Sequence, residues 1–234
     1  MDYQDVRSPE RSPERGDHGS TTPAPVPDFS LRDPIDSFIE TCRRLVTGPV
    51  PFFAGLPTNG GYRNPLAFGA ICVLIATIVG TVLGFGLQAL FLLPLLGQGS
   101  GGDFPFAAAT TAIVLLGIFV AVVVLTPLFA AIGLFLGAGI YHLFVMLLVR
   151  PNMGYEATFR ATAYSSIAHF ASAIPFVGIF GAFLYLFLVG VGIREMHHTT
   201  TERAAAVVLL PILLILLLMC ALVFMFFVVV FANA

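Results

Sequence analysis

Apolar residues gather in five long stretches after residue 64, separated by short polar or proline-containing breaks. A helix that crosses a bilayer needs about 20 mostly apolar residues, and each stretch approaches or exceeds that length. The pattern predicts an all-α polytopic membrane protein with five transmembrane helices and a cytoplasmic N-terminus. The expected spans are residues 66–93, 107–149, 157–174, 176–193 and 204–232.

The second stretch, 107–149, is long enough for two crossings, and Pro127 interrupts it. Basic residues concentrate on the cytoplasmic side of membrane proteins. Seven arginines precede residue 64 and four follow residue 149. A single crossing places all eleven on one side, whereas two crossings move the last four outside. We therefore favour one long, kinked helix, with two crossings as the alternative.

The residues before the first span divide into two parts. Residues 1–33 are polar and rich in proline, a composition typical of a disordered tail. Residues 34–63 are expected to form a short amphipathic helix, with Asp33 as N-cap and Pro34 first, and then an extended connector of prolines and aromatic residues. This helix is expected either to lie in the membrane interface or to pack on the transmembrane domain, residues 64–234. Its apolar positions recur at helical spacing: Ile35, Phe38, Ile39, Cys42, Leu45 and Val46.

Composition supports the membrane class and narrows the chemistry. Charged residues make up 10% of the chain, against about 25% in soluble domains. The three cysteines are scattered, which predicts neither a disulfide framework nor a metal site. The first apolar run begins at Leu66, so no secretory signal peptide is expected. We expect the lipid bilayer as partner, no nucleic acid and no cofactor, and the oligomeric state stays open.

Motifs of known chemistry are missing from the sequence. We find no His-Glu-x-x-His, no Gly-x-Ser-x-Gly and no phosphate-binding loop, so no catalytic, cofactor-binding or metal-binding residue is assigned. Polar residues do occur inside predicted spans, where ionisable groups are candidates for function. The alternative is a neutral histidine satisfied by one hydrogen bond. These intramembrane candidates are His142, Ser165, Ser166 and His169.

Charged residues also mark the expected cytoplasmic ends of the spans. Glu156 and Arg160 are four residues apart, in the order that favours an ion pair along one helix. Arginines here can simply anchor helix ends, but anchoring does not explain the accompanying glutamates. A docking surface for a cytosolic protein or an anionic lipid is the other interpretation. Its candidate residues are Tyr155, Glu156, Arg160, Arg194, Glu195 and His197.

Several motifs between residues 154 and 211 resemble the Yip1 domain family. They are Gly-Tyr-x-x-Thr-Phe-Arg-x-x-Ala-Tyr-Ser-Ser from Gly154, Ile-Pro-x-Val-Gly from Ile174, Tyr-Leu-x-Leu from Tyr185, Gly-Ile-Arg-Glu-x-His from Gly192, and the run ending Leu-Leu-Pro at Pro211. The Pro-Phe-Phe connector and Asn64-Pro65-Leu66 are similar to bacterial members. The resemblance implies five spans and a cytosolic N-terminus. Eukaryotic relatives act in vesicle traffic and contact prenylated Rab-type GTPases, whereas prokaryotic relatives have no settled molecular role.

These observations favour a non-enzymatic scaffold or adaptor, expected in the cell membrane of a bacterium. It would present the amphipathic helix and the charged loops to a cytosolic protein or to lipid headgroups. Transport of a small solute or a proton through the bundle is the alternative, since polar residues lie within short, proline-interrupted spans. An intramembrane enzyme ranks third, because the required acid, base or metal set is missing.

Overall fold

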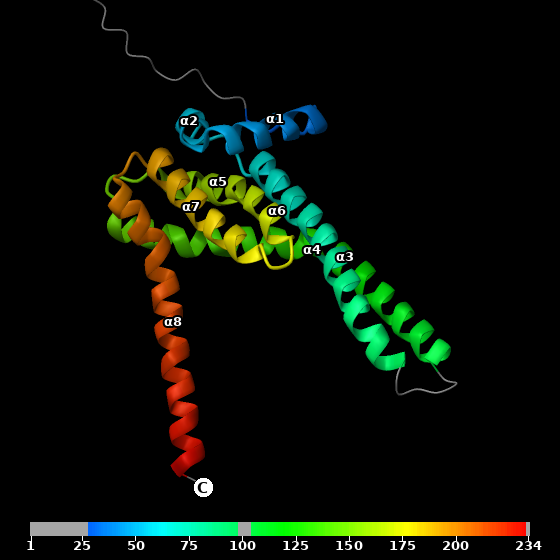
Figure 1. Ribbon diagram of the computed structural model, residues 1–234. Helices are drawn as coiled ribbons and strands as arrows, with labels where there is room; N and C mark the ends of the chain where they lie inside the picture. Colours follow the sequence, from blue (N-terminus) through cyan, green and yellow to red (C-terminus); the bar gives the residue numbers. More distant parts are fainter. Residues whose placement is uncertain (1–27, 98–103, 233–234) are drawn as a thin grey trace, which may run out of the picture.

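The computed structural model describes residues 28–97 and 104–232, and every regular element in these ranges is helical. Figure 1 shows two short helices lying across one end of a helical bundle, from which three long helices extend. The elements are α1 (Pro34–Thr47), α2 (Pro49–Gly55), α3 (Arg63–Gly97), α4 (Phe104–Leu148), α5 (Gly154–Ser165), the 3-10 helix η2 (Ser166–Ala168), α6 (His169–Ser172), α7 (Gly178–Met196) and α8 (Thr201–Ala232).

Four helices are long and apolar enough to cross a membrane. Their candidate spans are Arg63–Phe91, Ala109–Leu148, Gly178–Met196 and Thr201–Ala232. The remaining predicted span, 157–174, is divided among α5, η2 and α6. The break falls where the Ser165 hydroxyl donates to the Ala161 carbonyl, at 2.7 Å, and the chain tightens into a 3-10 turn. Side chains that bond the preceding turn in this way often bend helices.

The predicted second span is one helix, α4, with Pro127 inside it. A proline has no amide to donate, so the Val123 carbonyl lacks its usual partner four residues on. Figure 1 shows α4 running beside α3 in its first part and then turning beneath α5 and α7. The expectation of a single long helix with a kink is thus confirmed for this segment. The number of membrane crossings is a separate question.

Helix α5 lies at the centre of a group of helices that we call the inner bundle: α5, α6, α7 and the parts of α3 and α4 that pack on them. Every residue from 157 to 165 is buried, because α3, α4 and α7 all pack around this helix. Gly192 lets α7 approach closely, since a Cβ atom there would lie 2.8 Å from the Ala161 Cβ. The aromatic rings of Phe52 and Phe68 both pack against the ring of Tyr164 on α5. The most polar of the apolar stretches therefore becomes the most enclosed helix.

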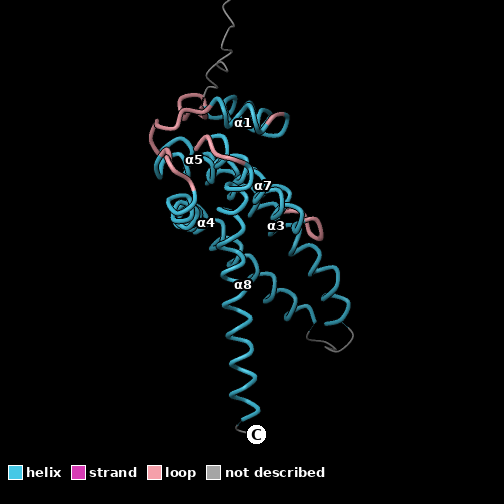
Figure 2. The backbone as a smooth tube through the Cα atoms, turned by 90° about the vertical axis from the view of Figure 1, so that its left-hand side faces the viewer, coloured by secondary structure: helices cyan, strands magenta, loops and turns pink. Residues whose placement is uncertain are grey.

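The N-terminal segment covers the bundle as a cap, defined here as residues 28–62. Helix α1 lies across the end of the bundle in both views (Figures 1 and 2). The expected extended connector is wrong for residues 49–55, which form α2 with Pro49 in its first turn and Phe52 and Phe53 buried. Proline suits the first turn of a helix, and burying two aromatic rings repays the ordering of this short segment.

The predicted disordered tail lies largely outside the described residues. Its last part, 28–33, differs from that expectation, because Phe29 is fully buried against Phe38 and Phe68. The Ser37 hydroxyl donates to the Ser30 carbonyl at 3.0 Å and accepts from the Ser30 amide at 3.1 Å. Burial of Phe29 and these hydrogen bonds hold a short polar segment that its composition alone would leave free.

Helix α8 is packed only at its beginning. Its buried residues are Ala204, Val207, Val208 and Pro211, whereas every residue from 212 to 232 is exposed. Figure 1 shows this part, coloured orange to red, leading away from the bundle. A run of 21 exposed apolar residues cannot be stable in water, so lipid is the solvent that this helix requires.

Candidate functional site

The polar residues of α5 point to two sides of this helix. Arg160, fully buried, faces the cap, and Thr158, also fully buried, faces α4 and the end of α7. Positions two apart on a helix point in nearly opposite directions, so two separate clusters form. We call them the arginine cluster and the histidine cluster.

The arginine cluster joins α5 to the cap. The Arg160 guanidinium pairs with the Asp28 carboxylate through Nη2, and its Nη1 donates to the Gly61 carbonyl at 3.2 Å. The predicted pair with Glu156 is confirmed at 3.9 Å between Nη1 and Oε1. That carboxylate also accepts from the amides of Gly60 and Gly61, at 2.5 and 2.6 Å. The two glycines are thus held between Glu156 and Arg160.

The conformation of this turn requires glycine. Gly61 has φ +85°, a region that side chains rarely adopt, and a Cβ on Gly60 would lie 3.1 Å from Arg160 Nη1. Burial raises the pKa of Asp28, and the Arg160 charge opposes that rise. A buried guanidinium that loses its carboxylate is expensive, so this cluster fixes where the cap sits.

The histidine cluster is a chain of hydrogen bonds through Thr158. The Thr158 hydroxyl lies 2.9 Å from His197 Nε2 and 2.9 Å from His142 Nδ1. At the other end, the Met153 amide donates to His197 Nδ1 at 3.1 Å. His197 Nδ1 therefore carries no proton, and in a neutral ring its Nε2 donates to Thr158. Helices α4 and α5 and the end of α7 are joined by this chain.

The pKa of His197 agrees with that assignment. Burial, with smaller contributions from the neighbouring His142 and His198, lowers the pKa of His197 to about 4. The ring is consequently neutral at pH 7, as an accepting Nδ1 requires. The sequence placed His197 on a cytoplasmic surface, but only 2% of it is exposed.

The other intramembrane candidates do not join the histidine cluster. Ser165 bonds its own helix, and the Ser166 hydroxyl is enclosed without a hydrogen-bond partner in the described part of the chain. His169 Nδ1 lies 2.9 Å from the Ser166 carbonyl, and its ring meets Tyr185 edge-on. His169 and Tyr185 line a largely apolar cavity of about 650 Å³ between α3 and α4. The sequence places Ser165, Ser166 and His169 in one set with His142, but in the structure these three residues lie apart from the histidine cluster.

The expected docking surface is only partly at the surface. Arg160 and His197 are buried, so they present nothing to a partner. The Tyr155 hydroxyl donates to the Phe135 carbonyl at 2.8 Å. Arg194 and Glu195 are half-buried and pair with each other, with 2.5 Å between Nη2 and Oε1. Of the predicted set, these last two and Glu156 keep carboxylate or guanidinium groups near solvent.

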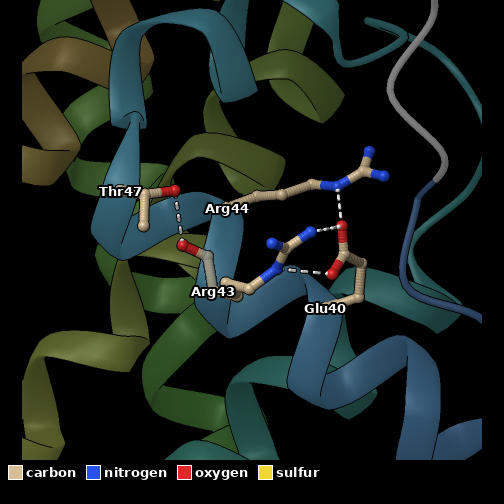
Figure 3. Close-up of polar contacts among 4 residues, drawn as sticks. All are labelled: Glu40, Arg43, Arg44 and Thr47. Carbon is tan, nitrogen blue, oxygen red and sulfur yellow. Dashed lines mark hydrogen bonds and ion pairs between the residues drawn. The ribbon is translucent and has the colours of Figure 1, made fainter.

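A second charged group lies on α1 (Figure 3). Glu40 accepts from Arg43 Nε at 2.8 Å and from Arg44 Nε at 2.6 Å. These hydrogen bonds lower the pKa of Glu40 to about 2. Arg43 is exposed and Glu40 and Arg44 are half-buried, so the group lies at the surface of the cap.

Sequence reasoning missed Asp28 and Thr158. Asp28 was assigned to a disordered tail. Thr158 stands in the motif that resembles the Yip1 domain, but nothing in that motif names a partner 39 residues away. A stronger hint was available for Arg160, because a lone arginine inside a predicted span must find a carboxylate. Among the described residues, no group of three or more histidine, cysteine or acidic side chains is placed to hold a metal ion.

Comparison with known proteins bears on the whole described bundle. The family model of the Yip1 domain matches residues 43–225, which include α2 to α7 entirely and most of α8. Neither the curated proteins nor the solved structures give a significant match. Since the family model covers most of the sequence, and the helices match a membrane protein, the chain belongs to the Yip1 domain family.

Proposed function

We propose that this protein is a non-catalytic membrane scaffold that presents its cap and inner loops to a cytosolic protein partner. The observation that carries the proposal is that two buried polar side chains of α5 are bonded to other parts of the protein. Arg160 and Thr158 use their hydrogen bonds to join α5 to the cap, to α4 and to the end of α7, and Ser165 bonds its own helix. Polar groups along a transport path face the path instead. What they stabilise is a fixed platform under the bilayer.

The proposed orientation has five crossings and a cytoplasmic N-terminus. The Met153 amide bonds His197 Nδ1, so the start of α5 and the end of α7 lie at the same end of the bundle. If α7 crosses the membrane, residues 154–174 must cross back, and at about 1.5 Å per residue they span roughly 30 Å. The cap binds at this same end through Glu156 and Arg160. The arginines at this end favour the cytoplasmic side.

The exposed apolar flank of α1 fits that orientation. Ile35, Ile39 and Val46 lie on one stripe and are 71%, 59% and 74% exposed, next to the flank buried on the bundle. A helix with such a flank and an opposite charged face lies in the membrane interface. The charged face, with Glu40, Arg43 and Arg44, is then left to meet a cytosolic partner. The bacterial cell membrane is the proposed location.

Photocrosslinking in cells tests the scaffold proposal. A photoreactive residue replaces Glu40 or Glu195 on the inner face, or Val82 on the exposed flank of α3 as the control. We expect one discrete protein adduct from the inner positions and none from Val82. If neither inner position captures a protein, the proposed docking face is wrong.

Proton transfer is a second candidate, favoured by one observation. The chain from His197 through Thr158 to His142 links three exchangeable groups at 2.9 Å spacing. Reconstituted vesicles with an internal pH dye measure the flux. Equal proton flux in the original protein and in His142→Ala would exclude a route through this chain.

A further inference from the structure

A small basic pocket opens where two connections meet at the inner end of the bundle. The residues between α4 and α5 form one wall, and the residues between α7 and α8 form the other. The pocket has a volume of about 150 Å³, which corresponds to about five water volumes at ~30 Å³ each. It is lined by Val149, Arg150, Pro151, Met153, His197, His198, Thr199, Thr200 and Arg203.

The charge of this lining has one sign. Its charged residues are two arginines, none of the lining residues is acidic, and the lining histidine His197 is neutral at pH 7. Both Arg150 and Arg203 are exposed, and no carboxylate of the described chain pairs with either. By contrast, Arg194 at the same end is paired with Glu195. Two guanidiniums in this pocket therefore have free donors.

A neutral donor adds to the two charges. The Thr199 hydroxyl is enclosed, and it has no hydrogen-bond partner among the described residues. An enclosed hydroxyl without a partner is uncommon, because burying it unpaired costs free energy. Simple anchoring of helix ends by arginine does not require such a group. The hydroxyl points to a ligand that accepts a hydrogen bond.

The start of α8 completes the pocket. Thr200 caps this helix by accepting from the Arg203 amide at 3.4 Å, so the positive end of the helix dipole lies in the pocket wall. Helix N-termini favour phosphate groups. Glu202 follows in the same turn, but its carboxylate is bonded to its own amide and to Thr200, and it does not line the pocket.

We propose that this pocket binds a phosphoryl group. Two guanidiniums, a free hydroxyl and a helix N-terminus together match the several acceptor oxygens of a phosphate monoester. The group comes either from a lipid headgroup or from a soluble phosphate. The inference rests on the scaffold proposal only for the side of the bilayer that the pocket faces. Binding by the purified protein tests it independently of any protein partner.

The experiment compares ligands and variants on the full chain in detergent. Native mass spectrometry measures binding of phosphatidic acid, a monoester, against phosphatidylglycerol, a diester, and calorimetry measures inorganic phosphate. We expect the monoester to bind more tightly than the diester. The variants Arg150→Gln with Arg203→Gln, and separately Thr199→Val, should weaken binding about tenfold to a hundredfold. Thr199→Val changes no charge, so a loss there cannot be general electrostatics.

The matched control is Arg63→Gln. Arg63 is an exposed arginine at the start of α3 and lies outside the pocket lining. Binding of phosphatidic acid alone identifies a headgroup site, and binding of inorganic phosphate alone identifies a soluble ligand. Equal binding of both lipids with an equal loss in Arg63→Gln would overturn the proposal, as would unchanged binding in Thr199→Val. Thermal unfolding of each variant separates lost binding from lost folding.

Discussion

The inner bundle around α5 and the outer part of α8 differ in how their side chains are surrounded. In the inner bundle, charged and polar side chains are buried, and most find partners across helices. In α8, residues 212–232 are apolar, and every one of them is exposed. The first region is specified by directional hydrogen bonds, and the second by the solvent alone. Single substitutions should therefore have large effects in the first region and small effects in the second.

The largest effect is expected at Arg160. Replacing it by methionine leaves Asp28 without its guanidinium and removes the hydrogen bond to the Gly61 carbonyl. Breaking one partner out of a buried ion pair costs about 3–5 kcal/mol. Thermal unfolding in detergent measures the loss. Adding Asp28→Asn should recover part of it, and no recovery would show that the pair does not hold the cap.

Next comes the response of the inner bundle to pH. His197 has its pKa lowered from 6.5 to about 4, so the folded protein favours the neutral ring. The neutral His197 ring contributes roughly 3 kcal/mol to the free energy of unfolding. This contribution is complete above pH 6.5 and is lost as the pH falls toward 4. Unfolding midpoints between pH 7 and pH 4 measure it. His197→Gln should flatten the slope in this window, and an unchanged slope would assign the dependence to another group.

A smaller loss of stability is expected from adding a methyl group where α5 and α7 approach closely. In Gly192→Ala the new Cβ meets Ala161 at 2.8 Å, and overpacking of this kind costs about 1–3 kcal/mol. Gly84→Ala on α3 is the control, because nothing lies within 4 Å of its Cβ position. Unfolding midpoints should fall only for Gly192→Ala. Equal behaviour of the two variants would contradict the close approach.

The buried beginning and the exposed outer part of α8 can be compared by one substitution in each. Val207 is fully buried, whereas Leu216 is 58% exposed on the same helix. Val207→Ala removes two buried carbons and costs roughly 1–2 kcal/mol at about 0.8 kcal/mol per methylene. Leu216→Ala should leave the unfolding midpoint in detergent almost unchanged. A large effect at Leu216 would indicate that another helix covers the outer part of α8.

The smallest effect is expected on the cap surface. Glu40→Gln breaks the exposed pairs with Arg43 and Arg44. Exposed pairs of this kind contribute little to stability, because water solvates the charges as well. The unfolding midpoint should not move measurably, even though the pKa of Glu40 is low. A clear loss would place this group in a contact with the bundle.

The long apolar helices and the ion pair within α5 could be predicted from the sequence, because both depend on local composition and spacing. Long apolar stretches fixed α3, α4, α7 and α8, and the spacing of Glu156 and Arg160 predicted their pairing. It could not predict that Asp28 meets Arg160, because a contact across 132 residues depends on tertiary packing. The α2 helix was missed because prolines and aromatics suit extended chains as well, and burial of Phe52 and Phe53 decided between them.

The ion pair between Asp28 and Arg160 also sets a practical boundary for anyone who shortens this chain. Cleavage just after Asp28 would remove the carboxylate that pairs with Arg160 and strand a positive charge inside the bundle, next to the buried ring of Phe29. A protease site or an affinity tag placed between Asp28 and Phe29 is therefore expected to destabilise the fold. A residue that matters for folding therefore lies well ahead of the first membrane helix.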